Sequence, residues 1–415
     1  MQGRLSLNRA WNAGWTQRSA LLLGALVLGT LIFFLKGTLH EQVISRGIDA
    51  CAQTSQEIDC LYGVIKKEMQ GRGIRSAMKA FGRAYEASDV FVASGCHRHA
   101  HQVGDMAYFE VSRGIYNLKG IDFPPETAAC SLGFYHGFLG HLFQDNHDPS
   151  FVVQTCRALI ERLQPIIPDI KDACFHAVGH GLVLSAIEEV PNSSAGDVDR
   201  IIEEPIAFCE SISGIESADR LSCKEGVLNV VTDWASDMRF GLSLDSTNPF
   251  SFCRDMRPDV REICMLEVSR KLSQVVGPDM RAIERLVRSH FGTSSAETAF
   301  RRGVGGFMTA YMRVPAGLHE LLIVCNGIIS EYRKVCIRAV AHVLAENSLA
   351  GREIDLPVSF CEQDMDADLQ RACWGMVAKK LRRFYSPSDQ LAHCALFPTD
   401  MRDLCQVATD KDAPK

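Results

Sequence analysis

The run CIRAVAHVLAE, Cys336–Glu346, decides the fold, because its pattern recurs along most of the chain. It opens on the second cysteine of a close pair, Cys325 and Cys336, and its apolar residues recur at i, i+3 and i+4, which is typical of an amphipathic helix. Similar runs are CLYGVIKKEM from Cys60 and CWGMVAKKL from Cys373. Period-two alternation with β-branched residues is scarce, so the sequence predicts an all-α fold.

These opening runs follow one another at intervals of 32 to 49 residues, most of them near 36. This step is the length of a two-helix hairpin with its turns, so we predict a solenoid-like α/α helical-repeat domain of about ten helix pairs. Accidental spacing in a globular helical protein is the alternative. In repeat length the chain resembles Sel1-like and tetratricopeptide-like arrays, but their consensus Ala, Leu-Gly and Tyr positions are not reproduced. The ten runs open at Cys60, Cys96, Cys130, Cys174, Cys223, Cys264, Phe300, Cys336, Cys373 and Cys405.

The cysteine content indicates an oxidising compartment, since sixteen cysteines are far more than a reduced cytosolic protein ordinarily carries. Each close pair is predicted to be a disulfide that joins the two helices of one hairpin, and Cys96 and Cys130, which lack close partners, are assigned to each other. A small residue three places after the cysteine, such as Gly133 or Gly226, is expected to let the two helices of a hairpin approach closely. The predicted close pairs are Cys51 with Cys60, Cys156 with Cys174, Cys209 with Cys223, Cys253 with Cys264, Cys325 with Cys336, Cys361 with Cys373, and Cys394 with Cys405.

The N-terminus has the composition of a membrane anchor. Residues 1–18 form a basic tail, and Ser19–Leu35, SALLLGALVLGTLIFFL, has no charge over 17 residues, near the lower limit for a transmembrane helix. A cleaved signal peptide is the alternative, but the apolar run ends in Phe33-Phe34-Leu35-Lys36, a poor cleavage site. We therefore predict an uncleaved signal-anchor at 19–35, with the N-terminus cytoplasmic and the rest periplasmic or extracellular. That rest is divided into a histidine-rich part, 36–190, and C-terminal repeats, 191–415.

Histidines are concentrated in three successive units, and they are the clearest functional signal. Eight of the thirteen lie between residues 97 and 180, and two pairs are spaced by four, which places both rings of a pair on one helix face. That geometry suits two ligands of one metal ion. The predicted metal ligands are His97, His101, His136, His141, His176, His180 and Asp105, the carboxylate being either a ligand or an acceptor that orients an imidazole.

Other histidines receive a structural interpretation. His99, His147 and His342 are expected to be hydrogen-bonded core or surface residues, although His342 lies six residues after its opening cysteine, as His136 and His180 do. For the cluster as a whole, a polar network between packed helices is the alternative to a metal. Zinc or iron suits the predicted ligands best, with copper and manganese as further choices.

The remaining sequence offers little other chemistry. Arg301 and Arg302 are expected to be solvated, an anion site at a helix start being the alternative. The net charge of −6 and the mixing of basic with acidic residues exclude a nucleic-acid interface. Two functions follow: a membrane-anchored, extracytoplasmic metalloprotein, left open as a metal-dependent hydrolase or oxidoreductase, or a non-catalytic envelope scaffold that binds a protein or peptide. The catalytic residues and the substrate are not identified.

Overall fold

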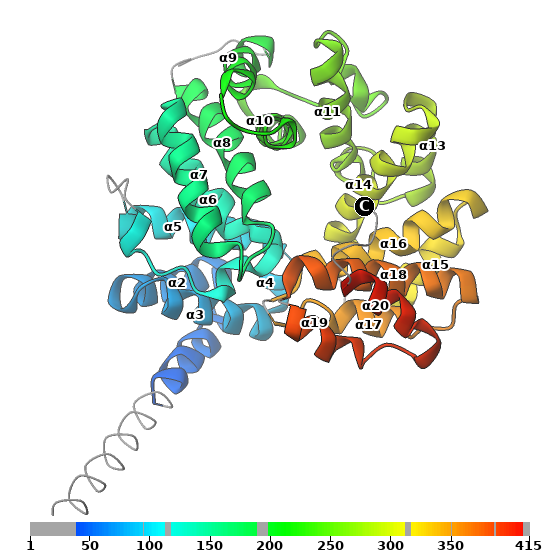
Figure 1. Cartoon of the computed structure of the whole chain (residues 1–415), viewed down its shortest axis with the longest axis horizontal. Coiled ribbons are helices and arrows are strands. Elements are labelled where there is room, and N and C mark those ends of the chain that lie inside the picture. Colours follow the sequence, from blue (N-terminus) through cyan, green and yellow to red (C-terminus); the bar gives the residue numbers. More distant parts are fainter. Residues whose placement is uncertain are drawn as a thin grey trace, which may run out of the picture. The chain divides into compact units, whose positions relative to one another are not determined.

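The computed structural model describes residues 39–93, 95–112, 118–188, 198–311, 317–349, 351–385 and 387–409. Within them all regular secondary structure is helical and no strand occurs, so the predicted all-α class is confirmed (Figure 1). The chain has two compact units, Met1–Val64 and Ile65–Lys415. The predicted boundary at 190/191 lies outside the described residues, and the division into 36–190 and 191–415 stays a prediction.

Ten helices carry the opening runs, and we call them the B helices. They are α2 (Glu57–Arg72), α5 (Cys96–Ala107), α6 (Ala129–Asp145), α8 (Ile170–Glu188), α10 (Ser217–Ser236), α11 (Pro258–Ser269), α14 (Thr293–Tyr311), α16 (Ser330–Glu346), α18 (Ala367–Phe384) and α20 (Arg402–Thr409). The other α-helices are α3 (Ile74–Ala87), α4 (Asp89–Ala93), α7 (Pro149–Leu163), α9 (Val198–Ser211), α12 (Leu272–Val275), α13 (Met280–His290), α15 (Gly317–Asn326), α17 (Asp355–Cys361) and α19 (Pro387–Cys394). Short π- or 3₁₀-helices are η1 (Tyr108–Ser112), η2 (Leu118–Gly120), η3 (Pro125–Ala128), η4 (Arg239–Gly241), η5 (Pro249–Cys253) and η6 (Thr399–Met401).

Local sequence sets several helix starts. Asp148, just before α7, accepts hydrogen bonds from the backbone N–H groups of Ser150 and Phe151, and Pro149 occupies the first helical position, where no N–H is needed. Asp366 caps α18 in the same way through the N–H of Leu369. Such caps satisfy backbone donors that the helix itself leaves unpaired.

Eight disulfides join all sixteen cysteines, with none left free. They connect the seven close pairs and also Cys96 with Cys130. The Cα–Cα distances of 5.3 to 5.8 Å are those of ordinary disulfides. Seven of the bridges close short loops within one hairpin, and each contributes roughly 3 kcal/mol in the chain-entropy account. The disulfide-bonded helical repeats predicted from the sequence are thereby confirmed.

The repeat that opens without a cysteine has a buried aromatic residue at that position. Phe300 of α14 stands where the other units have sulfur, and its side chain is fully buried. Its ring meets that of Tyr332 on α16 edge to face, with the centroids 5.1 Å apart, so the contact joins two successive units rather than the two helices of one hairpin. Burial of a phenylalanine side chain stabilises by about 1.5–3 kcal/mol.

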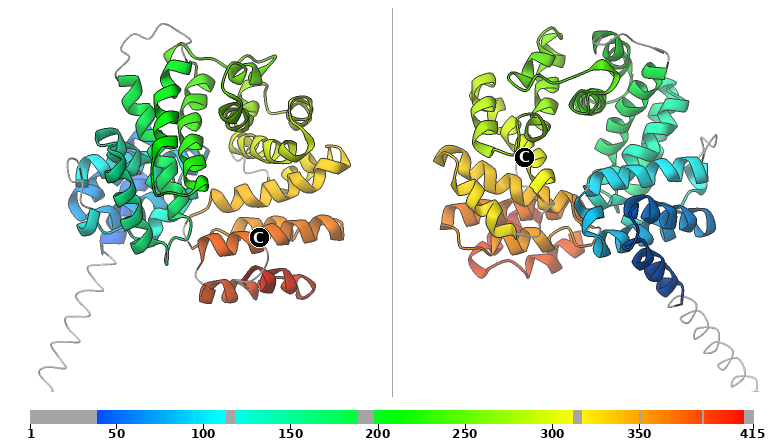
Figure 2. Two further views of the ribbon diagram at one scale, coloured as in Figure 1. Left: turned by 45° about the horizontal axis from the view of Figure 1, so that its top comes forward. Right: turned by 180° about the vertical axis from the view of Figure 1, so that it is seen from behind.

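Within the unit Ile65–Lys415 the B helices close into a ring. Successive contacts run from α6 through α8, α10, α11 and α14 to α16, and α16 also contacts α6 (Figure 1). In both views of Figure 2 the green helices α8 and α10, which are in contact, run side by side. At the closure, the backbone N–H of Cys130 donates to the carbonyl of Ser348 at 3.2 Å, and the Tyr85 hydroxyl donates to the carbonyl of Asn347. The solenoid-like repeats therefore close on themselves, a feature that the sequence did not predict.

Glycines allow the B helices to approach closely, but not in the expected way. A Cβ on Gly133 would lie 2.6 Å from the carbonyl oxygen of His97 on α5, and one on Gly226 only 2.0 Å from that of His176 on α8. These residues therefore face the preceding B helix rather than the helix of their own hairpin. The expectation that they serve the packing within a hairpin is wrong for both.

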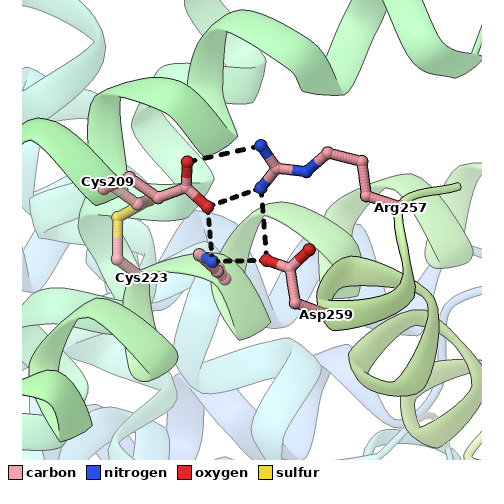
Figure 3. Close-up of polar contacts among 6 residues, drawn as sticks. Cys209, Cys223, Arg257 and Asp259 are labelled. Carbon is pink, nitrogen blue, oxygen red and sulfur yellow. Dashed lines mark hydrogen bonds and ion pairs between the residues drawn. A yellow bond between two sulfur atoms is a disulfide. The ribbon is translucent and has the colours of Figure 1, made fainter.

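Ion pairs on the outside connect neighbouring units. Beside the disulfide between Cys209 and Cys223, the Lys224 ammonium lies 2.6 Å from Glu210 Oε1 and 3.0 Å from Asp259 Oδ2, and Arg257 contacts the same two carboxylates (Figure 3). The network links α9, α10 and the start of α11. Since it is solvent-exposed, it adds little to stability.

The predicted transmembrane helix requires a correction. Among the residues that the structure describes, no helix is both long and apolar enough to cross a bilayer. The predicted span, 19–35, lies outside the described residues, as does the basic tail 1–18. The fold established by the structure is a disulfide-linked helical-repeat ring without a membrane span in its described part.

Candidate functional site

Five imidazoles, contributed by three neighbouring B helices, converge inside the ring. His136 of α6 is at their centre: its ring centroid lies 5.1 Å from that of His97, 6.1 Å from His101, 4.7 Å from His176 and 5.5 Å from His180. The first two neighbours belong to α5 and the last two to α8. We call these five residues the histidine cluster.

The close approach of the three helices brings the imidazoles together. Between α5 and α6, a Cβ on Gly104 would lie 2.0 Å from the carbonyl oxygen of Phe134, and one on Gly137 would lie 2.1 Å from that of His101. Between α6 and α8, a Cβ on Gly181 would lie 2.6 Å from the carbonyl oxygen of Gly140. Any side chain at these positions would push the helices apart, and the rings would lose contact.

A hydrogen-bonded chain fixes the protonation of part of the histidine cluster. His97 Nδ1 lies 2.9 Å from the carbonyl oxygen of Cys130, so this nitrogen carries the proton and donates. Its Nε2 then accepts from His136 Nδ1 at 3.3 Å, which leaves Nε2 of a neutral His136 with a lone pair. His101 Nε2 and His180 Nδ1 form a second contact at 3.3 Å.

One nitrogen of the cluster is left without a hydrogen bond. His180 is 4 % exposed, and its Nε2 is buried without a partner. An unsatisfied buried polar atom costs roughly 1–3 kcal/mol, and such atoms are rare in folded proteins. The nitrogen thus faces no partner at ordinary hydrogen-bond geometry, although the Asn229 side chain is near enough to raise the pKa of His180.

Burial lowers the pKa values of four cluster histidines, His97, His136, His176 and His180. It lowers the pKa of His97 to about 4 and that of His176 to about 3. It holds the pKa values of His136 and His180 well below the ordinary value, and the neighbouring imidazoles add to the effect, while Asn229 offsets it in small part at His180. At neutral pH these rings are therefore uncharged, the form in which imidazole binds metals.

Two of the predicted ligands stand beside the cluster rather than in it. Asp105 Oδ1 lies 3.7 Å from His101 Nδ1 and 3.5 Å from His141 Nε2, so the carboxylate bridges the cluster and His141. His141 Nδ1 contacts Gln144 Oε1 at 2.8 Å, and the Gln144 amide donates to Glu188. Asp105 is therefore placed as an acceptor that orients imidazoles, the second of the two roles considered for it in the sequence analysis. From it, polar contacts continue through His141 and Gln144 to the exposed Glu188.

The three remaining histidines named in the sequence analysis lie elsewhere. His99 stacks on Phe91 with centroids 3.6 Å apart, and its Nε2 donates to the Phe91 carbonyl oxygen at 2.7 Å. His147 packs near Phe208, and His342 lies 3.9 Å from Glu346. Although α16 closes the ring against α6, His342 is not part of the cluster.

Next to the histidines the ring interior carries charged groups that the sequence did not reveal. The fully buried Glu267 of α11 accepts from the Asn229 amide at 3.1 Å, lies 3.2 Å from Arg270 Nε, and also accepts from Arg302. Arg302 donates to Glu225 at 2.6 Å. We call these five residues the charged cluster.

The charges of the charged cluster change the pKa of a neighbouring histidine, His176. Burial raises the pKa of Glu267, but Arg270 and Arg302 outweigh it and lower the pKa to about 2. The same two guanidinium groups lower the pKa of His176, while Glu267 raises it. The histidine cluster and the charged cluster therefore form one continuous polar interior. The expectation that Arg302 is solvated is wrong, since its side chain is 15 % exposed.

A sequence signal for the charged cluster existed in the repeat register. Asn229 and Arg270 stand six residues after their opening cysteines, as His136 and His180 do. Glu225 stands two residues after its opening cysteine, as His176 does. Aligning the units by their openings would have placed these residues on the inner face of the ring beside the histidines.

A preformed metal site is not present in the described residues. No three His, Cys, Asp or Glu side chains within them are already arranged as the ligands of one metal ion. The convergence of the five imidazoles is a structural fact, whereas a bound metal stays a prediction.

Comparison with known proteins gives no relative for this chain. No family model matches the chain, and no curated protein and no solved structure was found to be similar to it.

Proposed function

We propose that this chain is an extracytoplasmic protein that binds a transition-metal ion through its histidine cluster. The observation that carries the proposal is the convergence of five imidazoles from α5, α6 and α8 around His136. The extracytoplasmic placement rests on the eight disulfides, which persist in oxidising compartments.

The ring spacing supports this proposal. Around one zinc ion with Zn–N bonds of 2.0–2.1 Å, two tetrahedrally placed imidazoles have centroids about 5 Å apart. Seven centroid distances within the cluster fall between 4.7 and 6.1 Å. The proposal requires side-chain rotations that turn the donor atoms towards a common point, because no three ligating side chains of the described residues are arranged so already.

The surroundings provide the groups that commonly orient metal-bound imidazoles. The Cys130 carbonyl accepts from His97 Nδ1, so the lone pair is on Nε2, and a metal there would replace the hydrogen bond from His136 Nδ1. Asp105 serves His101 similarly, at a longer distance. Nitrogen ligands without thiolates suit zinc, iron or copper better than manganese, which prefers oxygen ligands. With three imidazoles bound, the fourth position would accept water or substrate, the arrangement for metal-activated hydrolysis or oxidation.

A binding scaffold is the second candidate. It is favoured by the absence, among the described residues, of three ligating side chains already arranged for one metal ion. In that case the histidine cluster is a neutral polar network that holds α5, α6 and α8 in register. The closed ring would then present its surface to a protein or peptide partner.

The deciding experiment is elemental analysis of the purified full chain, before and after incubation with Zn²⁺, Fe²⁺ or Cu²⁺ alone. We expect close to one metal per chain, lost in a His136→Ala variant and in a His176→Ala, His180→Ala double variant. His342→Ala is the matched control, because it removes an imidazole from the same repeat position outside the cluster. Helical circular dichroism and thiol counts verify folding.

The outcomes separate the two candidates. If the wild-type chain takes up none of the three metals while its helices and disulfides are intact, the metal proposal is wrong and the scaffold remains. Equal metal loss in the His342→Ala variant would also contradict the assignment of the ligands.

A further inference from the structure

Three residues at the start of α6 have an unusual backbone. Cys130, Ser131 and Leu132 all lie in the left-handed region, with φ values of 56°, 57° and 63°. None of them is glycine, and a Cβ makes this conformation unfavourable. Three such residues in succession persist only where the surrounding contacts hold them in place. We call Cys130–Leu132 the left-handed segment.

On one side the left-handed segment is attached to the histidine cluster. The carbonyl oxygen of Cys130 accepts from His97 Nδ1 at 2.9 Å. A disulfide also joins Cys130 to Cys96, the residue directly before His97. It is the one disulfide of the eight that connects two B helices. The position of Cys130 therefore depends on that of His97.

On the other side the left-handed segment meets the end of α16, and this contact closes the ring. The N–H of Cys130 donates to the carbonyl oxygen of Ser348 at 3.2 Å, and the Ser131 hydroxyl donates to Glu346. Glu346 is buried, and its other carboxylate oxygen is paired with the buried Lys380 of α18, which fixes the acceptor. No disulfide crosses this closure contact, so hydrogen bonds help to keep the ring closed.

A single residue, Cys130, thus has contacts with both regions. Its N–H is directed to the closure contact and its carbonyl to the histidine cluster, and its own φ and ψ set the angle between the two groups. Relaxation of Cys130 to the right-handed region would change that angle, so the two hydrogen bonds could not both be retained. Loss of either contact therefore removes a restraint that the other one needs.

We propose that the left-handed segment couples the histidine cluster to the closure of the ring. An ordered His97 favours the closed ring, and opening of the ring weakens binding at the cluster. The metal-dependent part rests on the proposed function: a metal ion on Nε2 of His97 keeps the proton on Nδ1 and stabilises the hydrogen bond to Cys130. Linkage requires the reverse effect, so a loosened closure contact reduces the affinity for the metal by the same factor.

Titration of the purified full chain with Zn²⁺ tests the coupling from the closure side. Ser131→Ala removes the hydroxyl that donates to Glu346, and we expect its Zn²⁺ affinity to fall about 5-fold or more, as is typical of coupled sites. Ser359→Ala is the matched control, because that hydroxyl donates within its own helix, α17. If Ser131→Ala does not fold, Arg352→Gln replaces it, since it removes an exposed ion pair to Glu86 of α3 beside the closure contact.

Hydrogen exchange of the metal-free chain tests the coupling from the cluster side. His97→Ala removes the donor to Cys130. We expect the amides of Asn347 and Ser348, which are hydrogen-bonded at the end of α16, to exchange about 3-fold faster or more, because a lost hydrogen bond has at least that effect. His147→Ala, which removes an exposed histidine outside the cluster, is the matched control and should leave this exchange unchanged.

The two arms separate this inference from the metal proposal. Equal Zn²⁺ affinity of the wild type and the closure variant would overturn the coupling and leave the metal proposal in place. If the wild-type chain binds no Zn²⁺, the metal proposal loses its support and the exchange arm alone decides on the coupling. Unchanged exchange at Asn347 and Ser348 in a folded His97→Ala variant would overturn the coupling in either case.

Discussion

The two halves of the ring interior bury polar groups by opposite means. In α5, α6 and α8 the groups are imidazoles, which lose their charge because burial lowers their pKa values. In α10, α11 and α14 the groups keep their charges, because Glu267 is surrounded by Arg270 and Arg302. The repeat provides the same inner positions in both halves. The residue type at each inner position then decides whether a buried group becomes neutral, as the imidazoles do, or keeps its charge in an ion pair, as Glu267 does.

The difference has energetic consequences. A buried neutral ring needs only hydrogen bonds, and one nitrogen of the cluster, His180 Nε2, lacks even that. In a buried ion network each charge is stabilised by the opposite charges beside it. The loss of one side chain therefore leaves the remaining charges buried without a partner. The charged half should therefore be sensitive to deletion, and the histidine half should be the one open to a ligand.

The largest effect is expected for Glu267→Gln. The change leaves Arg270 and Arg302 without their shared carboxylate, and removal of one partner of a buried ion pair typically costs 3–5 kcal/mol. His136→Gln, the matched variant in the other half, leaves no unpaired charge and should cost about 1–2 kcal/mol in the absence of added metal. Urea unfolding of both variants beside the wild type measures the contrast. Equal losses would contradict the distinction between the two halves.

The same carboxylate predicts a pH dependence. The pKa of Glu267 is about 2 in the folded chain and near its ordinary value of 4.5 when unfolded. Its contribution to stability is therefore complete above pH 4.5 and is lost as the pH falls from 4.5 towards 2. Glu267→Gln should show a smaller decrease in unfolding free energy over this interval. An unchanged pH profile in the variant would show that Glu267 is not ionised in the fold.

A smaller loss is expected for Gly226→Ala, where α8 and α10 join the two halves. The new Cβ would lie 2.0 Å from the carbonyl oxygen of His176, so the backbones must separate, at a cost of about 1–3 kcal/mol. Gly375→Ala on α18 is the control, since nothing lies within 4 Å of its Cβ, and alanine is the better helix former by up to about 1 kcal/mol. The thermal midpoint should fall in the first variant and stay or rise in the second. A fall in both would indicate that the helix contact is not the cause.

The smallest effect is expected at the exposed network of Figure 3. Arg257 forms ion pairs with two carboxylates, Glu210 and Asp259, as the buried Arg302 does with Glu225 and Glu267. The side chain of Arg257, however, is exposed to solvent. Arg257→Ala should cost about 0–1 kcal/mol, and the cost should diminish in high salt. Urea unfolding at low and high salt measures it. A loss as large as that of Glu267→Gln would mean that burial does not separate the two networks.

Much of the fold was predictable from local patterns. The apolar spacing of runs such as Cys336–Glu346 predicted helices, and the short loops between cysteines left few alternatives for pairing within a hairpin. The spacing of four placed His97 with His101, and His176 with His180, on common faces. These features depend only on neighbours in the sequence, so the sequence is sufficient to predict them.

Other features were wrong or missed because they depend on how distant helices meet. The transmembrane helix predicted as part of the fold has no counterpart among the described residues. The closure of the repeats into a ring was not predicted. His141 lies beside the cluster, where it contacts Asp105, and its role as a ligand stays a prediction. Glu225, Asn229 and Arg270 carried no signal until the units were superposed by their openings.

The sequence by itself determined the helices, the crosslinks within hairpins and the helix faces that carry histidine, because each is set within a few turns of chain. The tertiary structure decided which faces meet. Six B helices contact one another in succession and close into a ring. Glycines at the contacts let the helix backbones approach closely. Five imidazoles and a buried ion network are thereby brought into one interior. The local periodicity of the sequence does not specify how these helices are arranged relative to one another.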